Sequence, residues 1–93
     1  MNEQKRKELN AKLKELKNKA YYELGKGEGY RVEVYGETDW DTPGLPDKAV
    51  LNWSATGDQT PETALKFAEA LKTLSELAAA YNKEREAAIA EEA

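Results

Sequence analysis

Apolar residues recur at helical spacing in the first third of the chain. Leu9, Leu13, Leu16, Ala20 and Leu24 follow one another at steps of four, three, four and four, which places them along one narrow stripe of a helix. The positions between them are mostly charged or amide residues. The pattern predicts a helix over 1–24 with a single apolar side, ended by the glycine that follows it.

The last third of the chain repeats this helical spacing over a longer distance. Its apolar stripe is Phe67, Leu71, Leu74, Ala78 and Tyr81. A threonine at 60 is a suitable N-cap, and the proline after it suits the first position of a helix. We therefore expect a second long helix over 60–90.

Between the two helices the apolar positions alternate, as they do in strands with one buried side. The alternation covers 29–36 and 49–56, on either side of a loop over 36–48 that contains Pro43-Gly44 and Pro46. The segment 29–56 is thus expected to be an antiparallel hairpin with a long acidic loop. The chain 1–93 is predicted to be one small α+β domain, in the order helix, strand, strand, helix, with the hairpin packed on both helices.

A two-stranded sheet is only marginally stable in water and has two open edges. Joining two hairpins, or packing helices across a two-fold axis, would remove that difficulty. The small residues Ala78, Ala79 and Ala80 permit close approach of a second helix. We therefore expect a homo-oligomer.

Composition excludes several kinds of chemistry. The 93 residues include neither Cys nor His, so thiol nucleophiles, Ser-His-Asp triads, Cys/His zinc sites and haem-ligating histidines are all excluded. Asp39 and Asp41 are the nearest pair of carboxylates for acid–base work, and no nucleophile motif accompanies them. The expectation is a protein that is not an enzyme and has no cofactor, no metal and no catalytic residue.

Charge and hydropathy bear on location and partners. The chain has 14 Lys and Arg against 18 Asp and Glu, a net charge of -4, which argues against nucleic acid as the partner. It has no apolar run of about 18 residues, and its first residues are polar rather than typical of a signal peptide. We expect a cytoplasmic protein without a membrane partner.

Two glycine- or aspartate-containing segments resemble ligand loops without fitting them. The run from Gly25 to Gly29 follows a helix end and leads into a strand, whereas phosphate-binding glycines follow a strand and open a helix. Asp39, Asp41 and Gly44 match three positions of a calcium loop, but the twelfth position is a valine. A helix stop with a connector, and ordinary turn chemistry, are the simpler interpretations.

Aromatic and short polar residues gather on and around the predicted strands. Arg31 is a candidate for pairing with a phosphate, and Tyr35 or Trp40 could stack on a base. The polar side chains of Asn52, Ser54 and Thr56 could form hydrogen bonds with the edges of that base. The candidate ligand-binding residues are Arg31, Tyr35, Trp40, Asn52, Trp53, Ser54, Thr56 and Thr60. Thr60 belongs to this set because N–H groups at a helix start can bind an anion. The alternative is a core tryptophan beside a solvated polar face.

The segment 50–71 also resembles a pattern found in small uncharacterised proteins of phages and prophages. The run Val50-Leu51-Asn52-Trp53-Ser54-Ala55-Thr56-Gly57 leads to Thr60-Pro61-Glu62 and then to Ala64, Phe67, Ala68, Ala70 and Leu71. The resemblance implies only a class of protein. Small acidic phage proteins that oligomerise often act against host defences, either by sequestering nucleotide signals or by blocking a defence protein.

The expected function is therefore that of a phage-type counter-defence protein. It would bind and sequester a small nucleotide immune signal as a homo-oligomer, in the cytoplasm of an infected bacterial host. One alternative is an inhibitor that binds a host defence protein through the acidic surface of Asp39, Asp41 and Asp47. Another is a structural phage component.

Overall fold

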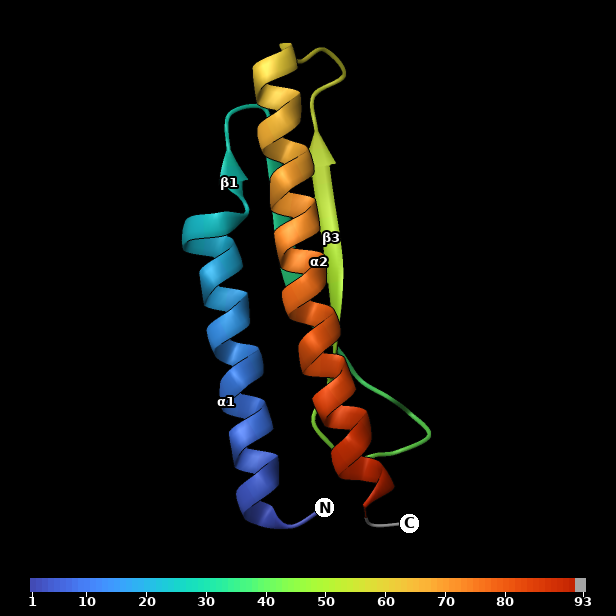
Figure 1. The fold of residues 1–93 in the computed structure, drawn as a ribbon. Helices are drawn as coiled ribbons and strands as arrows, with labels where there is room; N and C mark the ends of the chain where they lie inside the picture. The colour runs from blue at the N-terminus through green and yellow to red at the C-terminus, as the bar shows by residue number, and fades with distance from the viewer. Residues whose placement is uncertain (92–93) are drawn as a thin grey trace.

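The computed structural model describes residues 1–91 as two long helices and a three-stranded antiparallel sheet (Figure 1). The elements in chain order are α1 (Glu3–Lys19), the π-helix η1 (Ala20–Leu24), β1 (Lys26–Gly27), β2 (Tyr30–Glu37), β3 (Lys48–Ala55) and α2 (Pro61–Ala90). The molecule is elongated, 49 Å by 21 Å by 16 Å, and α2 spans most of its length. The α+β prediction is confirmed.

Both helices begin where capping residues stand in the sequence. The side chain of Asn2 accepts a hydrogen bond from the N–H of Lys5 at 2.7 Å, and α1 begins at the next residue, Glu3. Thr60 Oγ1 accepts one from the N–H of Thr63 at 3.1 Å, and α2 then begins with its proline. These bonds satisfy N–H groups that have no partner inside the helix.

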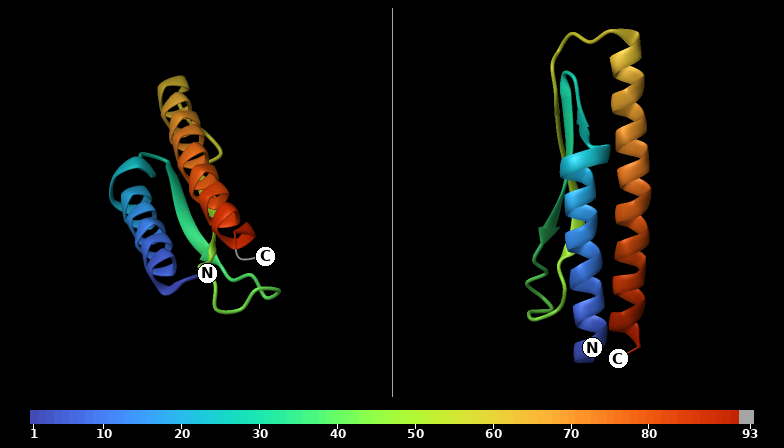
Figure 2. Two further views of the ribbon diagram at one scale, coloured as in Figure 1. Left: turned by 60° about the horizontal axis from the view of Figure 1, so that its bottom comes forward. Right: turned by 90° about the vertical axis from the view of Figure 1, so that its left-hand side faces the viewer.

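The strands lie in the order β1-β2-β3, and β2 pairs with β3 along eight residues, from Tyr30 opposite Ala55 to Glu37 opposite Lys48. Helix α2 runs along one face of the sheet, and α1 lies beside α2 at the side of β2 (Figures 1 and 2). Within residues 1–91 no helix lies over the opposite face of the sheet. This uncovered face is called the outer face below.

The third strand corrects the expected helix–strand–strand–helix order. A helix stop and connector were expected at 25–29, but Lys26 and Gly27 pair with the start of β2. Gly25 explains this close approach, since a Cβ there would collide with the carbonyl oxygen of Val32. Gly29 then turns the chain with a φ of +75°. The sheet therefore has more strands within one chain than the hairpin that motivated the oligomer prediction.

The first helix also differs from its prediction at its C-terminal end. Over Ala20–Leu24 the α-helix widens into a π-helix, and the N–H of Gly25 bonds to the carbonyl of Ala20 at 2.8 Å. Short π-helical segments are uncommon, and they occur frequently at functional sites. In this chain the segment carries two adjacent tyrosines, Tyr21 and Tyr22.

The core lies between the sheet and the two helices. Leu9, Leu74 and Val32 are fully buried, and they come from α1, α2 and β2 respectively. The other apolar core residues are Leu13, Leu16, Ala20, Val34, Ala49, Ala70, Ala78, Tyr81 and Ala88. Most of them belong to the alternating or helically spaced positions that predicted these elements.

The loop between β2 and β3, residues 38–47, is held against α2 by hydrogen bonds and an ion pair. The buried Arg85 donates from Nε to the carbonyl of Pro46 at 2.6 Å, and Tyr81 Oη donates to the carbonyl of Asp47 at 2.8 Å. Arg85 Nη2 also lies 3.7 Å from a carboxylate oxygen of Asp39. Two backbone carbonyls of the loop and the Asp39 carboxylate thus lie close to side chains of α2.

Candidate functional site

The outer face of the sheet carries polar and aromatic side chains in adjacent positions. Val32 and Val34 are buried toward the helices, so the residues that alternate with them in β2 point to the other side. The register places Arg31 opposite Ser54 and Glu33 opposite Asn52. Four of the predicted ligand residues therefore share this face, namely Arg31, Tyr35, Asn52 and Ser54.

Arg31 is held in place by three contacts at once. Its Nε donates to Glu33 Oε1 at 3.1 Å, and its Nη2 donates to the carbonyl of Tyr21 at 3.3 Å. Its guanidinium carbon also lies 4.3 Å from the centre of the Tyr21 ring, which is a cation–π distance. These contacts fix the direction of a half-exposed cation before any ligand arrives.

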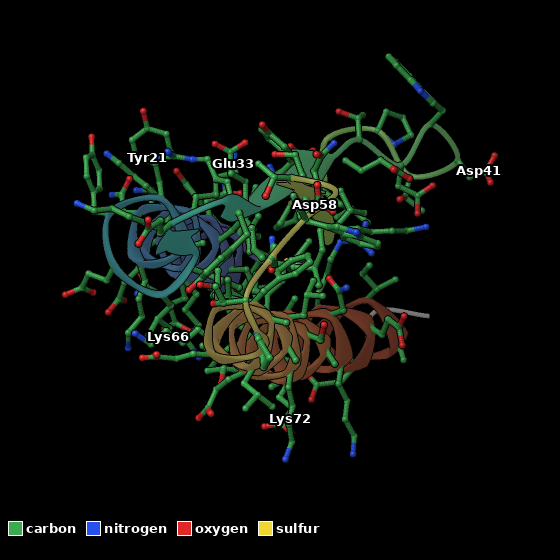
Figure 3. All side chains as sticks on the ribbon, turned by 90° about the horizontal axis from the view of Figure 1, so that it is seen from above. Tyr21, Glu33, Asp41, Asp58, Lys66 and Lys72 are labelled. Atoms are coloured by element: carbon green, nitrogen blue, oxygen red, sulfur yellow. The ribbon has the colours of Figure 1, made fainter. Side chains whose placement is uncertain are left out.

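The tyrosines of η1 form one wall of this site. Tyr21 and Tyr22 are 47% and 66% exposed, and their rings meet edge to face with centroids 4.9 Å apart. Figure 3 shows Tyr21 and Glu33 on the same side of the sheet, away from α2 with its Lys66 and Lys72. The sequence-based prediction missed both tyrosines. The available signal was a pair of adjacent aromatic residues at non-stripe positions of a polar helix.

Glu33 connects Arg31 to the third exposed tyrosine of the face. Tyr35 Oη donates a hydrogen bond to Glu33 Oε2, while the other oxygen of this carboxylate accepts from Arg31. The bond to Glu33 raises the pKa of Tyr35, because the carboxylate stabilises the protonated phenol. The chain of contacts from Tyr21 through Arg31 and Glu33 to Tyr35 thus extends across η1 and β2.

Two shallow hollows lie on either side of Arg31. The first has a volume of about 380 Å³ and is lined by Lys17, Asn18, Tyr21, Tyr22, Glu33, Val34 and Tyr35. The second has a volume of about 400 Å³ and is lined by Gly27, Gly29, Tyr30, Arg31, Ser54, Ala55 and Thr56. The first offers aromatic rings and a carboxylate, and the second offers backbone groups, hydroxyls and the arginine.

The remaining predicted ligand residues lie apart from one another. Trp53 pairs with Val32 and so belongs to the helix side of the sheet, where it is 56% exposed. Trp40 is 86% exposed in the loop 38–47 and lines neither hollow. Thr56 borders the second hollow, with its Oγ1 donating to the carbonyl of Asp58 at 3.1 Å. Thr60 acts as the cap of α2.

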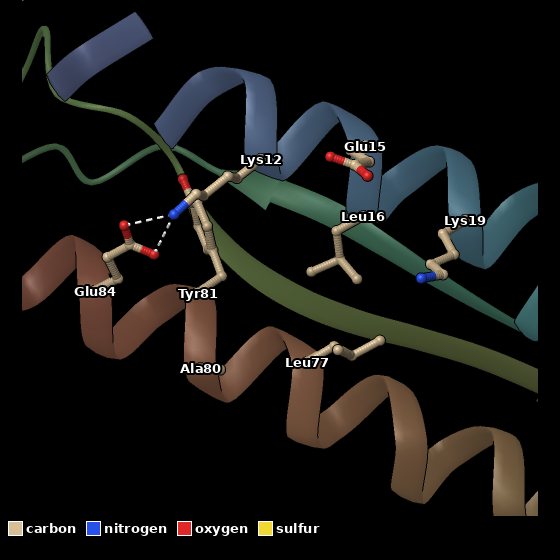
Figure 4. A pocket seen from close by; sticks show the side chains of 8 residues that line it. All are labelled: Lys12, Glu15, Leu16, Lys19, Leu77, Ala80, Tyr81 and Glu84. Carbon is tan, nitrogen blue, oxygen red and sulfur yellow. Dashed lines mark hydrogen bonds and ion pairs between the residues drawn. The ribbon is translucent and has the colours of Figure 1, made fainter. Parts of the chain in front are cut away.

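A third hollow, of about 250 Å³, lies between α1 and α2 (Figure 4). Its apolar floor includes Leu16 and Leu77. At one end Lys12 Nζ contacts both carboxylate oxygens of Glu84 at 2.7 and 2.9 Å, and Lys5 adds a contact at 3.0 Å. The two lysines lower the pKa of Glu84, Lys12 most strongly. The charges at this end are already paired between the helices.

The acidic loop shows no cluster that fits a metal ion. Within residues 1–91 no group of three or more acidic side chains is arranged to hold one. Asp39 accepts a hydrogen bond from the N–H of Asp41 at 3.1 Å, which lowers the pKa of Asp39, with smaller effects from nearby cations. Asp47 accepts a bond from Thr38 at 3.3 Å. Two of the three loop aspartates thus bind groups of their own chain.

No helix in the part of the chain that the structure describes is both long and apolar enough to cross a membrane. Comparison of the chain with protein-family models, with curated proteins and with solved structures gave no match.

Proposed function

We propose that this protein is a non-enzymatic binding protein whose ligand is a small nucleotide, held on the outer face of the sheet. The observation that carries the proposal is the fixed position of Arg31, which lies over the Tyr21 ring and against Glu33. A cation that is oriented beside exposed aromatic rings suits a ligand with both a planar ring and a phosphate.

Each part of such a ligand has a complementary group in the two hollows. The exposed rings of Tyr21, Tyr22 and Tyr35 offer faces and edges on which a base can stack. The carboxylate of Glu33 can accept hydrogen bonds from an exocyclic amino group of that base. The phosphate then lies in the second hollow, where Arg31 and the hydroxyl of Ser54 are the donors.

Sequestration of a signal requires binding and no chemical step. The absence of Cys and His from the sequence agrees with such a role, because the thiol nucleophile and the commonest acid–base side chain are missing. The resemblance of 50–71 to small phage proteins supplies the proposed setting, which is counter-defence in an infected bacterial cell. In this proposal the protein acts as a homo-oligomer that lowers the free concentration of a nucleotide immune signal.

The acidic-surface inhibitor has less support from the geometry. It requires carboxylates that are free to meet a partner, and Asp39 and Asp47 already bind groups of their own chain. Asp41 is exposed, and its side chain points outward from the loop (Figure 3). No particular contact in residues 1–91 favours the other alternative, a structural phage component.

The test is thermal unfolding of the protein with a panel of mononucleotides and cyclic dinucleotides. A ligand at a hundred times its Kd stabilises the native state by about 2.7 kcal/mol, which is about 10 °C or more in a chain of this size. We expect such a rise with at least one nucleotide. R31A and Y21A should remove most of it.

Matched variants test whether the effect belongs to the outer face. R6A removes an exposed arginine from α1, and W40A removes an exposed aromatic residue from the loop. Both should respond to the nucleotide as the unaltered protein does. Absence of any shift at about 1 mM of every nucleotide would contradict the proposal, since sequestration requires a Kd far below that concentration.

A further inference from the structure

The outward edge of β3 is uncharged and only partly covered. The nine residues from 49 to 57 contain no charged side chain, with Lys48 before them and Asp58 after them. Edge strands normally carry a charge, a proline or a bulge that prevents pairing with another strand. Here the large exposed side chain on the edge strand is instead Trp53, which is 56% exposed.

The hydrogen bonds of Asn82 show which backbone groups of β3 point outward. Ala49 donates from its N–H to Asn82 Oδ1 at 2.8 Å, and its carbonyl accepts from Asn82 Nδ2 at 2.9 Å. Ala49 therefore directs both backbone groups away from β2. Because these directions alternate along an antiparallel strand, Leu51, Trp53 and Ala55 direct theirs outward as well.

Asn82 thus covers the edge at one end and leaves the other end open. Ala49 has both of its outward groups satisfied by the amide of α2. On Leu51, Trp53 and Ala55 no side chain of residues 1–91 makes the corresponding bonds. The open part of the edge is three outward-facing residues long, and its middle residue is Trp53.

We propose that this open edge pairs with the same edge of a second copy of the chain, antiparallel and centred on Trp53. In that register Trp53 lies opposite Trp53 of the other copy, and Leu51 lies opposite Ala55, on both sides of the two-fold axis. All three free residues then find partners with free backbone groups. A register shifted by two residues keeps only two such pairs, because Ala49 is already bonded to Asn82.

The side chains agree with this register. A two-fold axis perpendicular to the sheet keeps both α2 helices on the same side, so the two exposed Trp53 side chains meet in the space between them. No like charges face one another along 49–57. The ends are complementary, because Lys48 of one copy is directed toward the segment that carries Asp58 in the other.

The pairing would join the two sheets into one of six strands. Asn52 of each copy lies opposite Ser54 of the other, so the outer faces of the two copies become continuous. This proposal stands without the nucleotide, since backbone pairing needs no ligand. It also gives the expected homo-oligomer a defined interface.

The first test is the mass in solution by sedimentation velocity, at chain concentrations up to about 300 µM, where a micromolar interface is saturated. We expect the unaltered protein to have twice the mass of one chain. W53K places a charge at the centre of the edge and should give monomers. The control L65K alters an exposed leucine of α2 and should remain a dimer.

A cysteine test reads the register and leaves Trp53 in place. The chain has no cysteine of its own, so N52C and S54C can each be made as the sole thiol. Residues directly opposite in this non-hydrogen-bonded position have Cα atoms about 4.5 Å apart, within the range of a disulfide. Under mild oxidation a mixture of the two variants should form the mixed disulfide, identified by intact mass, and each variant alone should not.

Three results would overturn the proposal. The first is an unaltered protein that stays monomeric throughout the concentration range. This result counts against the proposal even if the monomer pairs the edge of β3 with a peptide from another protein. The second is a W53K variant that remains folded and dimeric. The third is efficient cross-linking of N52C with itself, which corresponds to a shifted register. If W53K does not fold, the N52C and S54C mixture still tests whether the two edges pair, because both variants retain Trp53.

Discussion

The two faces of the sheet differ in what their side chains contact, although both faces belong to the same strands. On the covered face Val32 and Val34 are buried beneath the helices, and their side chains pack in the hydrophobic core. On the outer face Arg31, Glu33 and Tyr35 contact one another and a tyrosine of η1, yet much of their surface stays in water. The covered face accounts for stability, and the outer face has the groups that a ligand needs.

The largest expected effect comes from a change in the covered face. Leu74 is fully buried in α2, so L74A should lower the free energy of unfolding by about 2–5 kcal/mol, through lost burial and the cavity left behind. Urea denaturation measures this directly. N52A, on the outer face, should change it by less than about 0.5 kcal/mol. Equal losses in the two variants would contradict the division between the faces.

A smaller effect is expected where the loop 38–47 is fastened to α2. R85M keeps an apolar stem in the buried position but leaves the carbonyl of Pro46 without its donor, at a cost of about 1–3 kcal/mol. Hydrogen exchange should become faster in the loop than in the strands. The exposed Lys83 on the same helix provides the control K83M. Unchanged loop exchange in R85M would show that Arg85 does not hold the loop.

The smallest effect concerns titration on the outer face. Tyr35 has a raised pKa because it donates to Glu33, so the stabilisation from this bond is present below the ordinary tyrosine pKa of 10.0. It is lost as the pH rises through the higher folded value. In E33Q the pKa of Tyr35 should fall toward its ordinary value.

Phenolate absorbance measures this titration, and Y35F identifies the contribution of Tyr35 among the five tyrosines. If Tyr35 titrates identically in E33Q and in the unaltered protein, the hydrogen bond from Tyr35 to Glu33 is contradicted.

The long elements were predictable because each buries one side at a regular period. Leu9, Leu13 and Leu16 in α1, and Val32 and Val34 in β2, lie at the spacings that packing requires. The short strand β1 follows instead from a close backbone approach at Gly25, which depends on tertiary structure. The glycines suggested a break in the helix, but they did not indicate what the chain would pair with afterwards.

The candidate site was only partly predictable for a related reason. Alternation along a strand placed Arg31, Tyr35, Asn52 and Ser54 on one face. It did not bring in Tyr21 and Tyr22, because their position depends on the change from α-helix to π-helix and on the packing of η1 beside β2. Trp53 lies on the helix side, as alternation requires, but it stays half exposed because it sits on an edge strand.

The central claim is that the outer face binds the ligand, and an NMR titration tests it most directly. The nucleotide that gives the largest thermal shift would be added while the backbone amide signals are followed. We expect shifts concentrated in η1, β2 and β3, with Tyr21, Arg31 and Ser54 among the most affected residues. Shifts concentrated in the loop 38–47 or in the hollow beside Glu84, or no shifts at saturating nucleotide, would contradict it.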